Sequence, residues 1–175
     1  LNYMVNDDLT LYATQAAGYR PGGNQAPLPP FCSSDEAAQA NFSRRFNSDE
    51  AETTEFGVKA RGENYSANVT YFDVDWDGII IQVTPGCGWR YNFNGGKAET
   101  SGWEVDFTYA VNDEISLDFA GSSMTAETSI DISSLGASAG DRLPNTVETQ
   151  WNLGLVYDTT ITVSYTHLTL PTTVF

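Results

Sequence analysis

Basic residues, histidine and long apolar runs are scarce in this 175-residue sequence. Lys and Arg together number 8, against 23 Asp and Glu, which gives a formal net charge of −15. Proteins that bind a nucleic-acid backbone carry clustered Lys and Arg, so this composition excludes a nucleic-acid partner. No run of about 18 apolar residues occurs, which excludes a transmembrane helix. A membrane remains open, because the strands of a transmembrane barrel need only about 9–11 residues each.

Signs of catalysis or of a bound cofactor are also missing. The sequence holds no nucleophile elbow and no His/Cys cluster with metal-ligand spacing. Residues 73–78 (DVDWDG) are similar to the start of an EF-hand loop, but Thr84 stands where the bidentate Glu belongs. The flanks of that segment also have the periodicity of strands rather than helices. We therefore expect no enzyme, no cofactor, and no catalytic or metal-binding residue.

The dominant pattern is an alternation of apolar and polar residues, which is typical of strands with one apolar side. It is strongest over residues 97–111 and continues, after a short turn, through residues 115–119. Further strands are predicted at 1–5, 9–20, 54–60, 65–82 and 151–157. The strand at 65–82 loses its apolar parity at Tyr71 and Phe72, which predicts a bulge there.

Short polar turns and long irregular loops alternate between these strands. The turns lie at residues 6–8, 62–64, 112–114 and 158–160. The loops lie at about 21–50, with a short helix near 34–40, and at 83–92 and 128–145. Short turns on one side of a sheet and long loops on the other are the pattern of outer-membrane barrels. The sequence predicts an all-β, antiparallel up-and-down meander of about eight strands, a partial transmembrane β-barrel that is an open curved sheet in isolation.

A soluble β-sandwich is an alternative, because it too has one apolar face on each sheet. Two features favour the barrel. The predicted strands exceed the usual 5–6 residues, and all the long loops lie on one side, whereas sandwich loops occupy both ends. Aromatic side chains are also available for girdles at the membrane interfaces: Tyr3, Trp76, Trp103, Tyr109, Trp151 and Tyr157.

In a barrel, the alternation assigns each side chain to the lumen or to the lipid. The polar parity gives the lumen-facing candidates Arg20, Glu55, Lys59, Glu104, Asp106 and Asp118. The apolar parity gives the lipid-facing candidates Phe56, Val58, Trp103, Val105, Phe107, Tyr109 and Leu117. Glu55 and Lys59 are placed to pair with neighbours across the strands.

The two cysteines, Cys32 and Cys87, fall in two long loops on the same side of the wall. Two unrelated free thiols are one interpretation. A disulfide is favoured, because loops outside the cell lie in an oxidising environment.

Five segments resemble those of TonB-dependent receptors and follow that family's order. They are residues 18–24 (GYRPGGN), 52–60 (ETTEFGVKA), 71–79 (YFDVDWDGI), 94–104 (NGGKAETSGWE) and 140–144 (GDRLP). Together with the adjoining strands they cover about residues 8–158. The resemblance implies a location in the Gram-negative outer membrane and energised uptake of a scarce ligand too large for porins. That ligand would be a siderophore, cobalamin, haem or an oligosaccharide, and the sequence does not say which. A passive porin and a soluble all-β binding module are the alternatives.

The family's barrel has about 22 strands around a plug domain, so the resemblance implies a fragment from the C-terminal half. The implied partners are outer-membrane lipid and, through an N-terminal plug region missing from this sequence, the TonB complex. Residues 1–162 would form the partial barrel domain. Residues 163–175 resemble a translated sequencing-adapter tail, with a genuine Thr-rich edge strand as the alternative. The single histidine, His167, would then carry no chemistry.

Overall fold

A computed structural model describes residues 1–132 and 136–160. Nine strands lie in this part of the chain. Their bounds are β1 (Asn2–Asn6), β2 (Leu9–Arg20), β3 (Gly23–Asn24), β4 (Arg45–Phe46), β5 (Asp49–Arg61), β6 (Tyr65–Val83), β7 (Tyr91–Ala110), β8 (Ile115–Thr128) and β9 (Thr149–Tyr157). A 3₁₀ turn (Pro30–Cys32) and the helix α1 (Glu36–Asn41) lie between β3 and β4.

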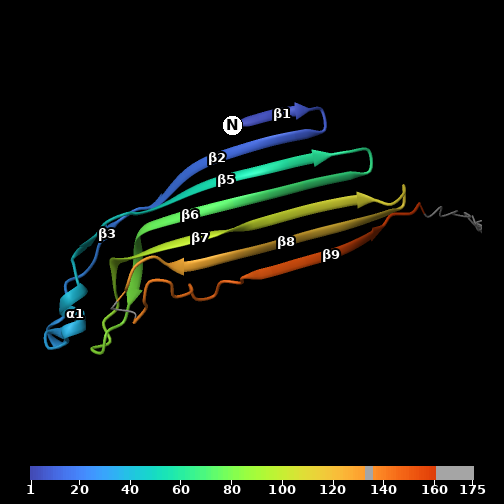
Figure 1. Ribbon diagram of the computed structural model, residues 1–175. Helices are drawn as coiled ribbons and strands as arrows, with labels where there is room; N and C mark the ends of the chain where they lie inside the picture. Colours follow the sequence, from blue (N-terminus) through green and yellow to red (C-terminus); the bar gives the residue numbers. More distant parts are fainter. Residues whose placement is uncertain (133–135, 161–175) are drawn as a thin grey trace, which may run out of the picture.

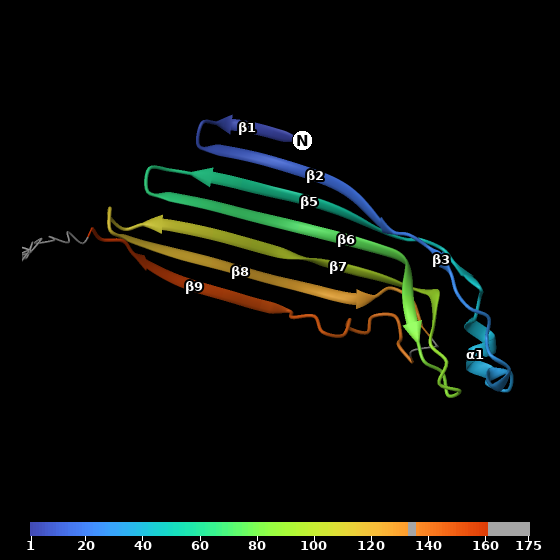
Figure 2. The same ribbon diagram turned by 180° about the vertical axis from the view of Figure 1, so that it is seen from behind.

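Seven strands form one antiparallel sheet in the order β1-β2-β5-β6-β7-β8-β9 (Figure 1). Every strand pairs with the strand that precedes it in this sheet, so the connectivity is up and down. The sheet is twisted and open, with β1 and β9 at its two edges (Figure 2). The predicted antiparallel meander is confirmed. The short hairpin of β3 and β4, which forms a second small sheet, was not predicted.

Tight turns connect neighbouring strands at one end of the sheet. In two of them an Asn side chain accepts hydrogen bonds from backbone N–H groups of the turn. The Asn6 Oδ1 accepts a hydrogen bond from the Asp8 N–H at 2.9 Å. The Asn112 Oδ1 accepts from the N–H groups of Glu114 and Ile115, at 2.9 and 2.8 Å. Such Asx turns reverse the chain within very few residues. Long connections leave the opposite end, as predicted (Figure 1).

The predicted bulge at Tyr71 and Phe72 is wrong. Pairing between β5 and β6 is regular at this point, with Phe56 opposite Tyr71. Phe72 lies opposite Gly102 of β7, on the otherwise polar side. The register shifts instead after Trp76 and again after Ile79, around Gly78, whose φ is +62°.

Several boundaries also differ from the prediction. The helix begins at Glu36 and ends at Asn41, close to the expected place, and the side chain of Asp35 caps it. The strand expected from Lys97 begins at Tyr91. The sequence pattern did not reveal residues 91–96 as strand because the Gly-rich residues 94–96 interrupt the alternation. The tail at 163–175 lies outside the described residues.

Buried apolar side chains gather at the loop end of the sheet, around the start of β7. Ala38, Tyr91 and Phe93 form a small core, with Leu28, Phe42 and Trp89 among the side chains packed on it. Large apolar side chains on the strands stay exposed, and Phe56 and Trp151 have exposed fractions of 56% and 72%. No described helix is long and apolar enough to cross a membrane.

Candidate functional site

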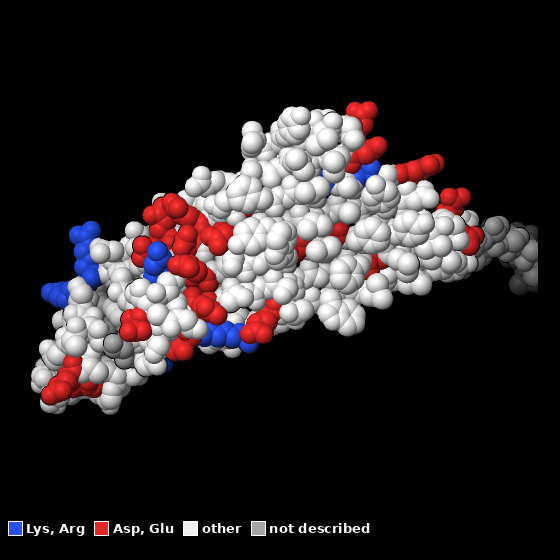
Figure 3. Space-filling view, in the orientation of Figure 1, with Lys and Arg blue, Asp and Glu red and all other residues white. Residues whose placement is uncertain are grey.

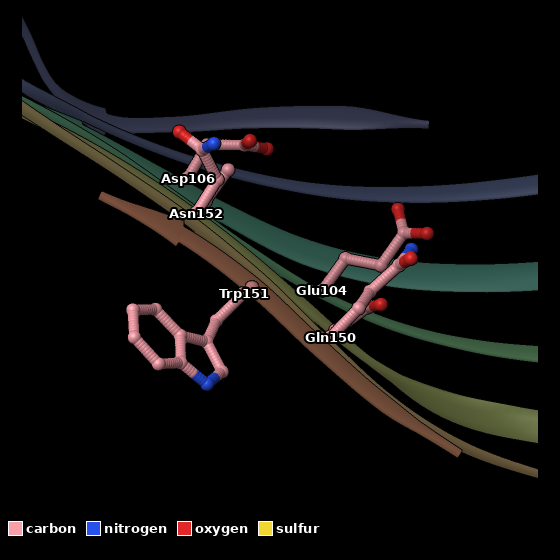
Figure 4. A pocket seen from close by; sticks show the side chains of 8 residues that line it. Glu104, Asp106, Gln150, Trp151 and Asn152 are labelled. Atoms are coloured by element: carbon pink, nitrogen blue, oxygen red, sulfur yellow. The ribbon is translucent and has the colours of Figure 1, made fainter. Parts of the chain in front are cut away.

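The strand register sorts the side chains of the sheet onto two faces. One row across it joins Tyr12, Gly57, Thr70, Glu104, Ser122 and Gln150. The neighbouring row, offset by one residue, joins Leu11, Val58, Val69, Val105, Gly121 and Trp151. Because successive side chains of a strand point to opposite sides, these rows define a polar face and an apolar face. Figure 4 shows Glu104, Asp106, Gln150 and Asn152 on one side and Trp151 on the other.

The sequence-predicted residues fall on these two faces as the alternation sorted them. The polar face carries Arg20, Glu55, Lys59, Glu104, Asp106 and Asp118. The apolar face carries Phe56, Val58, Trp103, Val105, Phe107, Tyr109 and Leu117. That the polar face lines a lumen and the apolar face meets lipid stays a prediction.

A hollow of about 330 Å³ lies on the polar face between β7 and β9. Glu104 and Asp106 stand on one side of it, and Gln150 and Asn152 on the other (Figure 4). The small residues 120–122 of β8 form its floor. Two carboxylates and two amides make this a surface that accepts hydrogen bonds and favours positively charged donors.

An aromatic ring occupies the polar face farther along the sheet, on β2. Tyr12 lies directly over Gly57, where a Cβ would come within 2.2 Å of the ring. Its hydroxyl is 2.6 Å from the Thr70 hydroxyl. The Lys59 ammonium lies 5.0 Å from the ring centroid, so Lys59 makes a cation–π contact. The expected pairing of Glu55 and Lys59 with charged neighbours across the strands is not among the ion pairs of the described residues.

Asp49 joins several groups at the loop end of the polar face and is only 2% exposed. Its carboxylate forms an ion pair with Arg20 and accepts hydrogen bonds from the N–H groups of Arg20 and Ile80, at 3.2 and 3.1 Å. The Arg20 guanidinium also lies 5.0 Å from the Trp76 ring. Trp76 therefore lies on the polar face, and its expected place in a membrane-interface girdle is wrong.

The surroundings of Asp49 favour its charged form. The hydrogen bond from Arg20 lowers the pKa of Asp49 from 3.8 to about 2, against the opposing effect of burial. Asp49 lies beyond the apolar band of the sheet, at the start of β5. Sequence reasoning missed it because residue 49 fell in the predicted loop; an acid-rich strand start opposite Arg20 was the only available signal.

Carboxylates mark where the apolar face ends. Glu52, Asp75, Glu99 and Glu127 are direct cross-strand partners that share the parity of the apolar face in β5, β6, β7 and β8. Figure 3 shows acidic side chains gathered beside the largely uncharged middle of this face, on the side of the loops. Because ionised side chains are excluded from hydrocarbon, the apolar band ends below this row.

The two cysteines meet in the loops at the same end. Cys32 and Cys87 form a disulfide with an S–S distance of 2.04 Å and a Cα–Cα distance of 5.3 Å. That this bond also forms in the exported protein stays a prediction. No group of three or more His, Cys, Asp or Glu side chains suited to a metal ion occurs within residues 1–132 and 136–160.

A family model described as TonB dependent receptor-like, beta-barrel matches residues 1–171. The chain belongs to this family. Its place is accordingly the Gram-negative outer membrane, and the resemblance drawn from the five sequence segments is confirmed. The family is one of receptors.

Solved structures share this fold at low sequence identity. The ferric yersiniabactin uptake receptor FyuA from Yersinia pestis is 19% identical, with a TM-score of 0.68 over 88% of this chain and 21% of that one. The ferric-catecholate import receptor Fiu from E. coli K12 is 20% identical, with a TM-score of 0.60 over 91% and 22%. The copper transporter OprC is 16% identical, with a TM-score of 0.62 over 90% and 23%. The chain thus spans about a fifth of the length of these proteins.

Proposed function

We propose that this chain is part of the barrel wall of an outer-membrane receptor for the energised uptake of a scarce, large ligand such as a siderophore. The observation that carries the proposal is the two-faced sheet in a chain of this family. One face is apolar across β2, β5, β6, β7, β8 and β9, as a lipid-facing wall requires. The other is polar and holds few bulky side chains, as a wall around further protein or a solvent-filled path requires.

In this proposal the polar face packs on a plug domain of the intact receptor. The hollow at Glu104 and Asp106 supplies acceptors for basic or amide side chains of that plug. Coupling to the TonB complex would run through the plug. The wall residues would therefore hold and orient the plug, and they would not transmit the energy themselves. They carry no proposed chemistry, and the protein is a receptor rather than an enzyme.

The ligand class is supported by the solved structures of the same fold. FyuA is a ferric yersiniabactin uptake receptor, Fiu is a ferric-catecholate import receptor, and OprC is a copper transporter. A metal complex of this kind is the ligand we propose. A soluble module is disfavoured because the family is a membrane-barrel family, and a passive porin is disfavoured because the family is one of TonB-dependent receptors.

Uptake by the intact receptor that carries this sequence tests the proposal. Cells lacking their own siderophore receptors would express it and receive ⁵⁵Fe bound to a panel of hydroxamate and catecholate siderophores. We expect uptake of at least one complex in cells with TonB and none in cells without it. Diffusion of small sugars that needs no TonB, with no binding of any metal complex, would indicate a porin and overturn the proposal.

A further inference from the structure

A two-stranded arm leaves the sheet at its loop end. Pairing of β6 with β5 stops at Asp77, and pairing of β7 with β8 begins only at Ala98. Between these limits β6 and β7 continue to pair with each other, with residues 79–83 of β6 opposite residues 91–96 of β7. Both views show the end of β6 turning sharply away from the other strands (Figures 1 and 2). The turn coincides with the double register shift around Gly78.

The arm bends toward the polar face. Its Ile80 N–H donates to Asp49, and its Ile80 carbonyl accepts from the Arg20 guanidinium at 3.3 Å. Both partner side chains belong to the polar face of the sheet. The peptide groups of Ile80 could not reach them from the apolar face. The arm therefore lies at the mouth of the space that the polar face lines.

The first long loop is hydrogen-bonded to this arm at two places. The Gln25 side-chain amide donates to the Asn92 carbonyl at 2.7 Å and accepts from the Asn92 N–H at 2.8 Å. One side chain thus takes the place of a neighbouring strand along an edge that would otherwise be unpaired. The Asn94 side chain likewise donates to the Asn47 carbonyl at 3.0 Å and accepts from its N–H at 2.7 Å.

The two loops also share a core and a covalent bond. Tyr91 of the arm is 3% exposed, packs edge-on against Phe42 and donates to the Ala37 carbonyl at 3.3 Å. Asp35 accepts from the Ala38 N–H of its own helix and from the Cys87 N–H of the other loop, at 3.0 and 2.7 Å. The Cys32–Cys87 disulfide lies beside these contacts and joins residues 55 positions apart.

We propose that residues 23–47 and 80–94 form one rigid cap over the mouth, and that this cap moves as a single body about the bulge at Gly78. Asp49 is its latch, because that carboxylate holds Ile80 of the cap to Arg20 of the wall. The disulfide prevents one loop from opening without the other. The inference rests on the proposed receptor function and names what controls access to its ligand path.

Hydrogen exchange measured by mass spectrometry on the intact, oxidised receptor tests the cap. We expect peptides covering 25–42 and 87–94 to exchange at rates within about threefold of each other. After reduction with a phosphine, both should exchange at least tenfold faster, while the loop at 136–148 stays unchanged. The Cys32→Ser/Cys87→Ser variant should be fast from the start and indifferent to the reductant.

A latch variant separates a single body from two loops. With the disulfide intact, Asp49→Asn should speed exchange in both cap segments by the same factor, as a body released from the wall requires. Asp118→Asn is the matched control, since within the described residues its carboxylate accepts a hydrogen bond only from Thr108 on the same polar face. Acceleration in one loop alone, in the latch variant or on reduction, would overturn the proposal.

These readouts do not depend on uptake. Coupled exchange in a receptor that imports no metal complex would support the cap and overturn the proposed ligand class. TonB-dependent uptake of a metal complex by a receptor whose two loops exchange independently would support the proposed function and overturn the cap.

Discussion

At the level of single residues, Gly57 matters because its lack of a side chain leaves space for the Tyr12 ring on the polar face. Tyr12 lies flat only because Gly57 places no Cβ beneath it, and this position lets its hydroxyl reach Thr70. The ring also carries the Lys59 ammonium. A glycine in a strand interior is costly for the backbone, and here it allows a close approach between β2 and β6 across β5.

Gly57→Ala should therefore destabilise the intact receptor by about 1–3 kcal/mol, because the added methyl group forces the ring away. Unfolding in urea from lipid bilayers measures this. Gly154→Ala is the matched control, because its nearest contact would be 3.6 Å, an ordinary packing distance. The double change Tyr12→Ala/Gly57→Ala should cost less than the sum of the two single changes. Strict additivity would show that the ring and the glycine do not interact.

Asp49 gives stability a defined dependence on pH. Its pKa is about 2 in the folded protein and 3.8 as the reference value, so folding favours the charged form. A lowered pKa contributes stability above about pH 4, and this contribution disappears as the pH falls toward 2. Since Arg20 is partly exposed to solvent, we expect roughly 1–2 kcal/mol at neutral pH.

Asp49→Asn tests this expectation. The variant should unfold more easily than the wild type at pH 7, and the difference in the free energy of unfolding should shrink as the pH approaches 2. Equilibrium unfolding of both proteins across this range supplies the measurement. An equal difference at pH 7 and pH 2 would contradict a charged, Arg20-bound carboxylate.

At the scale of elements, the strands are defined by the two-residue period of their side chains. β7 and β8 show this best, since Phe107 lies opposite Phe119 on the apolar face and Asp106 opposite Ala120 on the polar face. A one-residue slip would move every side chain to the wrong face. The register is therefore strongly determined wherever one face meets lipid.

Phe107→Arg should cost roughly 2–4 kcal/mol in bilayers if residue 107 lies near the midplane. Glu104→Arg keeps a charge on the polar face and is expected to cost far less. The free energy of unfolding of both variants, in the intact receptor reconstituted in lipid, makes the comparison. Tolerance at Phe107 together with intolerance at Glu104 would reverse the assignment of the faces.

At the scale of the whole molecule, the sheet has two free edges. The outer edges of β1 and β9 have no strand partner among the described residues. Unpaired edges are excluded from hydrocarbon and promote association in water. The polar face also carries Gly57, Gly102, Ala110, Ala120 and Gly154, which offer too little bulk to fill a narrow closed barrel.

The 175-residue chain expressed alone should therefore fail to form a closed barrel. We expect aggregates on size exclusion and no heat-dependent mobility shift in gels. The intact receptor, refolded in the same detergent, is the control and should show that shift. A monodisperse, heat-modifiable and ligand-transporting fragment would refute the assignment to a wider wall.

Much of the wall could be predicted from the sequence because its signals are local. Alternation determined which of Trp103, Glu104, Val105 and Asp106 share a face, and Asn-rich turns determined where strands reverse. The error at Tyr71 and Phe72 has the same origin. Two adjacent aromatic residues look like a slipped register until the regular pairing with β5 and β7 shows Tyr71 on the apolar face and Phe72 on the polar face.

The class of sheet, its two faces and the family can be inferred from the sequence alone, because a strand's face follows from parity and the motifs are contiguous. Three features become visible only in the folded chain: Asp49 joins Arg20 to Ile80, Trp76 lies on the polar face beside Arg20, and Gln25 binds the edge of β7. These contacts join residues 29 to 67 positions apart. They depend on the register of every strand between them and on the bulge at Gly78, and no local pattern encodes either.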